Sequence, residues 1–488
     1  MAQAGGYTVL DVFERSAQRW PQNPAIVLPD RAITYAELHA ASQRFGRALV
    51  REAPQPVVAL YFPMMPQFVI AYLGVLYAGK QALPLNLLLP PEEVKGIMSD
   101  AGANVIVAPA ELCAKIAPLS LRVLDFGALS TADVDAAAPL PRPAPDDVCT
   151  LLYTSGTAGK PKGVMLTHRN LATNASSAAE AMGIGPDNRL LACLPTFHTF
   201  TLTGTVLGPL AVGASIVTMP RFDPEGVLKT ASALQCSVLM MVPSMYRLLV
   251  RMQERRPYET RHLRLAIAGG EALPPEVGAK FEKVFGIPLL EGYGQTESSP
   301  VIAFNTLREN KPGTVGKAIP GVQVKIADPE TLADLPVGKT GELWVKGPNV
   351  MKGYHNRPAE TAQAITRDGW LRTGDMGELT ADGFIRVTGR LREMVKVAGE
   401  MVFPAEVENA LLQHPAVLEA GAIGARDERK GEMVKAFVVL KPGAQATAEQ
   451  LLQHCRAVLA SYKVPRVVEF RTELPKGPTG KVMRRLLK

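Results

Sequence analysis

The chain has 488 residues, of which 47% are hydrophobic and 20% are charged, and its formal net charge is +7. This length exceeds one ordinary core, so we expect two or more compact units, and the composition excludes a disordered or fibrous chain. The five cysteines are scattered without a C-x-x-C pair, which argues against a disulfide framework or a zinc site and fits a reducing cytosol.

The N-terminal segment predicts a cytoplasmic protein. Asp11 and Glu14 stand where a secretion signal would be apolar. The longest apolar runs, such as residues 68–79, are shorter than the ~18–20 residues that a membrane span needs. Peripheral membrane contact stays open. The basic residues are dispersed, so no nucleic-acid partner is expected, and a protein that handles polyanionic small molecules fits the charge equally well.

The first part of the chain alternates helical patterns with short β-like runs. The expected elements are a helix over 35–50, a strand over 57–62, a helix over 66–79, and strands over 104–109 and 148–154. The proline-rich stretch 139–147 predicts a surface linker before the last of these strands. Strand–helix alternation of this kind indicates α/β layers with parallel pairing.

A second α/β run and two smaller units follow. The expected strands of this run are 214–219, 236–243 and 263–270. From about residue 313, short β runs such as 321–328 and 341–347 predict a small β subdomain. A helix over 404–414, a β-hairpin over 418–440 and a helix over 448–463 predict a separate α+β unit. The predicted fold class is therefore α/β, with a large domain over 1–391 and a small α+β domain over 392–488.

Residues 151–163, "LLYTSGTAGKPKG", have the composition of an anion-binding loop. Glycines allow close backbone approach, and successive N–H groups, hydroxyls and lysines supply donors and charge. The loop is not a Walker A motif, because Thr154 stands at the first glycine and Pro161 at the final Ser/Thr. The alternative is a flexible surface loop.

Residues 289–300, "LLEGYGQTESSP", combine an aromatic residue with a hydroxyl and a carboxylate. Tyr293 between two glycines can stack on a nucleobase. Thr296 and Glu297 can meet a phosphate and its Mg²⁺, which prefers a carboxylate oxygen beside substrate phosphates. The alternative is a β-turn with ordinary surface acids.

Three further segments carry candidate polar residues. Residues 370–379 predict a tight turn with Asp375, whose carboxylate can meet ribose hydroxyls or can simply form the turn. Residues 389–408 supply Arg390 and a glycine loop. Lys481 lies in a glycine turn near the C-terminus, where a solvated basic tail is the alternative.

The order and spacing of these motifs resemble the adenylate-forming superfamily of acyl-CoA synthetases, peptide-synthetase adenylation domains and luciferases. The resemblance runs from about residue 7 to 488. The family's signature loop reads Y-T-S-G-T-T-G-x-P-K-G, and Ala158 here replaces one threonine. The resemblance implies an N-terminal AMP-binding domain and a mobile C-terminal domain.

The resemblance also implies the nucleotide site. The β- and γ-phosphates of ATP would be held by Thr154, Ser155, Gly156, Thr157, Gly159 and Lys162. The adenine would lie against Gly270, Glu271, Ala272, Tyr293 and Gly294. Thr296 would touch the α-phosphate and Glu297 would hold Mg²⁺, while Asp375 and Arg390 would bind the ribose.

The remaining roles concern the acid and the thiol. Lys481 would bridge the reacting carboxylate and the α-phosphate. His198 matches the histidine that lines the acyl pocket and gates the second substrate, although a lone histidine beside aromatics is more often a core residue. The acyl pocket is expected to be apolar, with His198, Phe200, Met241 and Val242. Arg392 matches the hinge and Gly399 the thiol tunnel.

These residues predict an AMP-forming acid–thiol ligase that uses ATP, Mg²⁺ and coenzyme A. A medium- or long-chain fatty acid is the favoured substrate, since residues 291–300 contain no basic residue for a second carboxylate. An aryl acid and an acyl carrier protein as acceptor are the alternatives. A third alternative is a relative that has lost catalysis. It is disfavoured because the chain contains all four of the expected polar residues Glu297, Asp375, Arg390 and Lys481. The oligomeric state is left open.

Overall fold

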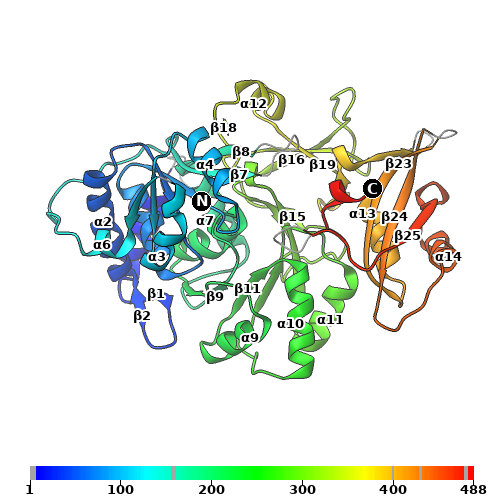
Figure 1. Cartoon of the computed structure of the whole chain (residues 1–488), viewed down its shortest axis with the longest axis horizontal. Helices are drawn as coiled ribbons and strands as arrows, with labels where there is room; N and C mark the ends of the chain where they lie inside the picture. The colour runs from blue at the N-terminus through cyan, green and yellow to red at the C-terminus, as the bar shows by residue number, and fades with distance from the viewer. Residues whose placement is uncertain (1–6, 120, 155–160, 398–399, 428–430, 477–481) are drawn as a thin grey trace. The chain divides into compact units, whose positions relative to one another are not determined.

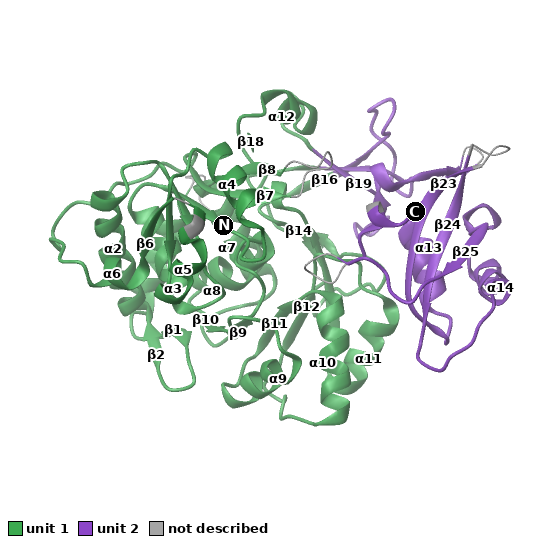
Figure 2. Ribbon diagram, viewed as in Figure 1, with its two compact units in different colours: residues 1–324, 345–371 green, residues 325–344, 372–488 purple. Residues whose placement is uncertain are grey.

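The computed structural model describes residues 7–119, 121–154, 161–397, 400–427, 431–476 and 482–488. The chain forms two compact units, which Figure 2 shows in different colours. Unit 1 comprises the chain up to Val324 together with Val345–Leu371, and unit 2 comprises Lys325–Trp344 and Arg372–Lys488. The boundary between residues 391 and 392 stays a prediction. The α/β class with a small C-terminal α+β part is confirmed.

Unit 1 contains a nine-stranded sheet whose central strands are parallel. Its order is β15 (Lys317–Ala318), β14 (Val301–Phe304), β13 (Leu289–Gly294), β12 (Leu265–Ala268), β11 (Val238–Met241), β9 (Arg189–Ala192), β10 (Ser215–Thr218), β1 (Pro24–Val27) and β2 (Ala32–Thr34). Because β11, β12 and β13 are parallel neighbours, their carboxyl ends meet at one edge of the sheet, where α/β proteins bind ligands.

A seven-stranded sheet forms the other layer of strands in unit 1. Its order is β18 (Gly353–Tyr354), β8 (Lys162–Thr167), β7 (Val148–Thr154), β4 (Gln81–Pro84), β3 (Val57–Leu60), β5 (Val105–Ala108) and β6 (Arg122–Asp125). Strands β7 and β8 are antiparallel, and Thr154 pairs with Lys162 at the end of their ladder.

Helices cover both sheets of unit 1 (Figure 1). They are α1 (Val9–Arg19), α2 (Tyr35–Glu52), α3 (Pro66–Tyr77), α4 (Pro91–Asp100), α5 (Ala110–Ile116), α6 (Phe126–Thr131), α7 (His168–Ala181), α8 (Gly208–Ala211), α9 (Pro224–Ala233), α10 (Pro243–Arg255), α11 (Pro275–Phe285) and α12 (Pro358–Ala364). The other helical segments of unit 1 are the 3₁₀ helices η1 (Ala117–Leu119) and η3 (Thr296–Ser298) and the π-helix η2 (Phe200–Leu207).

Unit 2 is built mainly on two small sheets. The four-stranded sheet has the order β16 (Gln323–Ala327), β17 (Gly341–Lys346), β19 (Leu371–Leu379) and β20 (Ile385–Arg390). The five-stranded sheet comprises β22 (Glu400–Val402), β21 (Val395–Val397), β24 (Gly431–Leu440), β23 (Val417–Asp427) and β25 (Val467–Phe470). Its helices are α13 (Pro404–Leu412) and α14 (Ala448–Val458), with 3₁₀ turns η4 (Leu391–Glu393), η5 (Ser461–Lys463) and η6 (Arg484–Leu486).

Side-chain caps and close packing explain why the first helices form where they do. Thr8 and Thr34 close capping boxes with Asp11 and Glu37 at the starts of α1 and α2, which satisfies backbone N–H groups that lack helical partners. Helix α2 lies directly against α3 because Gly46 has no side chain: a Cβ there would be 2.8 Å from the Cβ of Tyr77.

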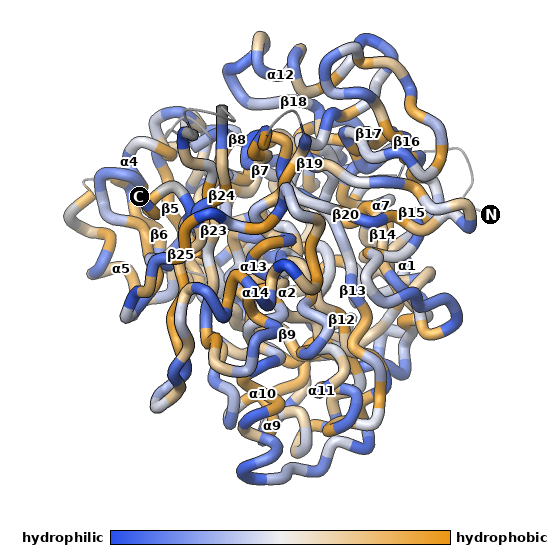
Figure 3. The backbone as a smooth tube through the Cα atoms, turned by 90° about the vertical axis from the view of Figure 1, so that its right-hand side faces the viewer, coloured by the Kyte–Doolittle hydropathy of each residue, from blue (hydrophilic) through white to orange (hydrophobic). Residues whose placement is uncertain are grey.

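The core follows the strands. Every residue of β3, β5, β11, β12 and β14 is buried. Figure 3 shows hydrophobic residues along the strands and hydrophilic residues in the loops at the periphery. This burial agrees with the apolar runs that predicted these strands, since strands covered on both faces have continuous hydrophobic sequences.

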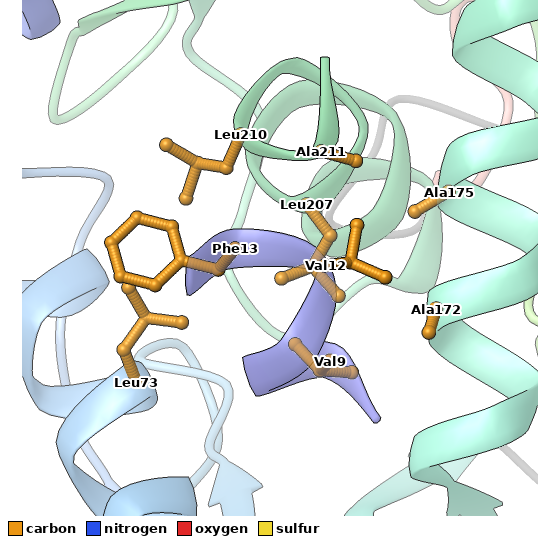
Figure 4. A pocket seen from close by; sticks show the side chains of 9 residues that line it. All are labelled: Val9, Val12, Phe13, Leu73, Ala172, Ala175, Leu207, Leu210 and Ala211. Atoms are coloured by element: carbon orange, nitrogen blue, oxygen red, sulfur yellow. The ribbon is translucent and has the colours of Figure 1, made fainter. Parts of the chain in front are cut away.

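A small void of about 10 Å³ remains among the helices of unit 1 (Figure 4). It is lined only by apolar side chains: Val9, Val12, Phe13, Leu73, Ala172, Ala175, Leu207, Leu210 and Ala211. A cavity of this size holds one water at most, and this lining offers a water no polar partner. The void is therefore a packing defect and is too small for an acyl chain.

Most expected elements are confirmed, and two expectations are wrong. The helix expected over 448–463 ends at Val458, because Leu459 turns into an extended conformation and packs against the core of unit 2. Asp375 does not lie in a tight turn: it lies within β19, opposite Arg390 of β20. Within the described residues, no helix combines the length and the apolar character that crossing a membrane requires.

The buried His168 makes unit 1 sensitive to acid. Its side chain is 2% exposed, and its Nδ1 accepts a hydrogen bond from the Val9 backbone N–H at 3.4 Å. Burial lowers the pKa of its imidazole to about 4, while Asp147 and Asp11 oppose that shift. The unfolded chain takes up this proton near pH 6.5, so the unfolded state binds more protons between pH 6.5 and 4.

We predict that the free energy of unfolding contributed by His168 is present above pH 6.5 and is lost as the pH falls toward 4. At pH 5 the loss amounts to about 2 kcal/mol. Denaturant unfolding of wild type and His168→Gln at pH 7.5 and 5.0 measures it. The wild type should lose more stability than the variant on acidification; equal losses would contradict the prediction.

Candidate active site

The predicted adenine residues follow the carboxyl ends of β12 and β13. Gly270, Glu271 and Ala272 begin two residues after the last residue of β12, and Tyr293 and Gly294 are the last two residues of β13. Gly270 has φ +81°, a conformation that favours glycine. The structure therefore brings these five residues to one edge of the sheet.

Glu291 supports this loop and was missed by the sequence analysis. Its Oε1 accepts a hydrogen bond from the Leu273 backbone N–H at 2.9 Å. Burial raises the pKa of this carboxyl group to about 7, and the Leu273 hydrogen bond opposes that shift. Glu291 ties β13 to the residues that follow β12, so both parts of the predicted adenine site share one support.

The predicted phosphate loop spans the connection from β7 to β8. Thr154 ends β7, Lys162 begins β8, and the two residues pair with one another. Ser155, Gly156, Thr157 and Gly159 lie outside the described residues. The Lys162 ammonium forms an ion pair with Glu360, and its Nζ lies 5.1 Å from the ring centroid of Tyr354.

Thr296 and Glu297 lie together in the 3₁₀ helix η3. The Thr296 hydroxyl lies 3.2 Å from the Thr199 hydroxyl. The Tyr354 hydroxyl donates to Glu297 Oε1 at 2.9 Å, and the Glu297 backbone carbonyl accepts from the Met351 N–H at 2.9 Å. Both side chains are only partly buried, so a substrate can reach them.

Two buried asparagines on α7 bond two segments near Glu297: the strand that follows it in the chain and the distant residues 348–350. Asn174 bonds both the N–H and the carbonyl of Val301, at 3.0 and 2.7 Å. One turn earlier, the Asn170 amide donates to the carbonyls of Pro348 and Val350 at 2.8 Å each. A pair of asparagines four residues apart in "NLATN" was the available sequence signal, because residues four apart share one face of a helix.

His198 and Phe200 lie at the start of the π-helix η2. His198 is exposed, so it is not the core histidine that the sequence analysis gave as the alternative. The centroid of its ring lies 4.4 Å from that of Phe197. Protein atoms on its other sides desolvate the imidazole and lower its pKa below the usual value, so the ring is neutral at pH 7. An eight-residue π-helix is rare, and such segments often occur at functional sites.

The structure does not bring Met241 together with Phe200. Met241 is fully buried in the core that α10 and α11 share with β11, whereas Phe200 packs on the other side, with Met240. Successive side chains of a strand point to opposite faces, so Met240 takes the place expected of Met241. Val242 lies beside Gly270, where a Cβ would be 3.6 Å from Val242 Cγ1.

Asp375 and Arg390 form an ion pair in unit 2. Arg390 Nε lies 2.7 Å from Asp375 Oδ1, and Asp375 is 3% exposed. The buried Glu342 orders the residues just before Asp375: it accepts hydrogen bonds from Trp344 Nε1 and from the backbone N–H of Gly374. Arg392 is exposed in η4. Gly399 and Lys481 lie outside the described residues.

Comparisons with known proteins identify the family. A model of AMP-binding enzymes matches residues 13–355, and a model of the AMP-binding enzyme C-terminal domain matches residues 406–481. A long-chain-fatty-acid–CoA ligase of Bacillus subtilis (strain 168) is 35% identical, over 98% of this chain and 94% of the relative. A sulfoacetate–CoA ligase of Cupriavidus necator is also 35% identical, over 96% and 95%.

Solved structures of other proteins agree with this family assignment. ATP-bound MatB from Rhodopseudomonas palustris has a TM-score of 0.90 at 31% identity, covering 99% of this chain and 98% of that one. MenE, an o-succinylbenzoate–CoA synthetase of Bacillus subtilis solved with ATP and a magnesium ion, has a TM-score of 0.87 at 30% identity, covering 98% of both chains.

Fold and site define an adenylate-forming enzyme. The chain belongs to the AMP-binding enzyme family, and its activity is that of an ATP-dependent, AMP-forming acyl-CoA ligase.

Proposed function

We propose that the acid substrate is a medium- or long-chain fatty acid, which the enzyme converts to an acyl-adenylate and then to a coenzyme A thioester. The observation that carries the proposal is the apolar environment of the partly buried Phe200 side chain. The relatives act on acids as different as long-chain fatty acids and sulfoacetate, so the choice of acid rests on this chain's own residues.

Phe200 and its neighbour Met240 each pack closely against a glycine. A Cβ on Gly269 would be 3.3 Å from the Phe200 ring, and a Cβ on Gly204 would be 3.2 Å from Met240 Sδ. The neighbouring buried side chains include Met240 and Ile267, which are both apolar. This apolar environment favours an aliphatic chain over a charged group beside Phe200, because burying an unpaired charge is costly. It also accepts an aryl acid, the second candidate.

In the first half-reaction, a carboxylate oxygen attacks the α-phosphorus of ATP and pyrophosphate leaves. We assign Thr296 to the α-phosphate, Lys162 with the phosphate loop to the β- and γ-phosphates, and Asp375 and Arg390 to the ribose. The residues act by orienting the reactants and by stabilising the negative charge of the transition state.

The site around Glu297 fits Mg²⁺. A partly exposed carboxylate beside the Thr296 hydroxyl is an all-oxygen donor set, which Mg²⁺ prefers. Mg²⁺ is usually held by one or two carboxylates together with substrate phosphates, so a single protein carboxylate is sufficient for this proposal. When bound, Mg²⁺ would neutralise phosphate charge and fix the triphosphate.

In the second half-reaction, the thiolate of coenzyme A attacks the acyl carbon and AMP leaves. We propose that the small domain alternates between two poses about Arg392: one brings Lys481 to the reacting carboxylate, the other brings Gly399 to the thiol. An acyl carrier protein is the alternative acceptor, and thioester formation measured with coenzyme A and with holo carrier protein side by side separates the two.

The apolar environment of Phe200 predicts a preference for acids with longer aliphatic chains. Each buried CH₂ contributes ~0.8 kcal/mol, so a few methylenes give at least about a tenfold advantage in kcat/KM over acetate. Pyrophosphate release measured with acetate, octanoate, palmitate and benzoate tests this. Turnover of acetate equal to that of the fatty acids would refute the proposed substrate, and a benzoate preference would favour the aryl acid.

Glu297→Gln should weaken adenylation, because it removes the proposed ligand charge while keeping an oxygen for the Tyr354 hydroxyl. We expect kcat/KM for MgATP to fall by about 10–100-fold, with the melting temperature unchanged. Glu309→Gln is the control, since Glu309 is a surface acid paired with Lys317. A change within a factor of two would show that Glu297 is an ordinary surface acid.

Lys481→Ala should separate the half-reactions. Loss of one well-placed electrostatic donor costs about 10²–10³ in rate, so adenylation should fall by that factor. Supplied acyl-adenylate should still react with coenzyme A at nearly the normal rate. Gly399→Leu should show the reverse by blocking the thiol tunnel. Single-turnover kinetics of each step measures both; equal slowing of the two steps by Lys481→Ala would contradict domain alternation.

A further inference from the structure

Lys162 is already neutralised by a neighbouring carboxylate. Its ammonium pairs with Glu360 Oε2, while Glu360 Oε1 accepts a hydrogen bond from Arg357 Nη1 at 3.1 Å. The side chains of Lys162 and Glu360 are 21% and 32% exposed. The pair therefore lies in a region that solvent and a ligand can reach, where an ion pair contributes little and exchanges readily.

The fold places Glu360 beside Lys162 through β18 and α12. Tyr354 pairs with Val164 in the β18–β8 ladder, and the His355 N–H donates to the Gly163 carbonyl at 2.7 Å. The Thr361 hydroxyl, in the first turn of α12, accepts from the Tyr354 N–H at 2.9 Å and donates to the Arg357 carbonyl at 2.9 Å. These bonds tie the start of α12 to the strand that Lys162 begins.

Each partner keeps a second contact when the pair opens. Glu360 keeps Arg357, and Lys162 keeps the face of Tyr354, whose ring centroid is 5.1 Å from Nζ. The Tyr354 hydroxyl is fixed by Glu297, so the ring holds the lysine near the proposed metal ligand. Lysine carries a point charge on a flexible stem, which allows its ammonium to move from a carboxylate to a phosphate.

From these contacts we infer that Glu360 is a competing anion built into the site, which the β- and γ-phosphates of the nucleotide must displace from Lys162. The inference rests on the proposed role of Lys162. Glu360 weakens the binding of ATP and of pyrophosphate, and it takes the lysine back when pyrophosphate leaves. It is a positioning residue that sets phosphate affinity and touches no reacting atom.

Binding measurements on Glu360→Gln test the inference. An exposed ion pair contributes up to ~1 kcal/mol, so the variant should bind ATP and magnesium pyrophosphate about two- to fivefold more tightly. AMP lacks the β- and γ-phosphates, and its Kd should not change. Isothermal titration calorimetry without acid substrate gives all three values. The gain should shrink at high salt, which screens an electrostatic effect.

A double-mutant cycle with Lys162→Met separates this inference from the proposed function. Lys162→Met alone should weaken ATP and pyrophosphate binding, and in its background Glu360→Gln should no longer tighten either. Glu92→Gln is the matched control, since it removes an exposed ion pair with Lys95 in α4. That control should leave all three Kd values unchanged.

The outcomes are distinct. If Lys162→Met leaves ATP binding unchanged, the phosphate role of Lys162 fails, and the inference with it. If Lys162→Met weakens binding but Glu360→Gln weakens it too, Glu360 holds the lysine in its productive position and only the inference is overturned. An unchanged pyrophosphate Kd in Glu360→Gln, or tighter binding that persists in the Lys162→Met background, would overturn it as well.

Discussion

The segment with Thr296 and Glu297 cannot hold its own shape, and the rest of the site in unit 1 depends on its position. A 3₁₀ helix of three residues makes too few internal hydrogen bonds to be stable alone. Its buried backbone groups must find partners elsewhere. Side chains supply them: Asn174 bonds Val301, the Thr203 hydroxyl donates to the Ser299 carbonyl, and Asn349 donates to the Ser298 carbonyl.

The need for hydrogen-bond partners also connects this segment to residues 349–354. The Met351 N–H donates to the Glu297 carbonyl, and three residues later the Tyr354 hydroxyl donates to the Glu297 carboxylate. Because β18 pairs with β8, the strand that Lys162 begins, Tyr354 reaches both predicted phosphate-site groups. The proposed metal ligand Glu297 and the proposed phosphate-binding Lys162 thus contact the same aromatic side chain.

A site for a triphosphate needs concentrated positive charge, and such charge also attracts unwanted anions. The ion pair between Lys162 and Glu360 lowers the net positive charge at the proposed phosphate site. In unit 2, Asp375 pairs with Arg390 in a comparable way, but Asp375 is buried and Glu342 accepts a hydrogen bond from the N–H of the preceding residue, Gly374. The first pair is suited to exchange and the second to a fixed geometry.

Local patterns in the sequence were sufficient for the strands and for the motifs that follow them. Apolar runs predicted β7, β11 and β12 because a strand buried on both faces needs hydrophobic residues throughout. The two-glycine setting of Tyr293 and the order of the motifs predicted a nucleotide site, and the residues of that site stay a prediction. Each motif is a short run of neighbouring residues, so it can be read along the chain.

Contacts between distant segments could not be read in this way. Tyr354 and Glu297 are 57 residues apart, and Asn174 and Val301 are 127 apart, so no local pattern links them. Asp375 shows the same limit: "RTGD" has the composition of a turn, yet pairing with β20 makes it a strand. The sequence analysis placed Met241 beside Phe200, but the structure places Met240 there, because the tertiary structure decides which face of β11 meets Phe200. The sequence by itself determined the family and the motifs; tertiary pairing decided which side chains meet, since hydrogen bonds and packing depend on distance in space.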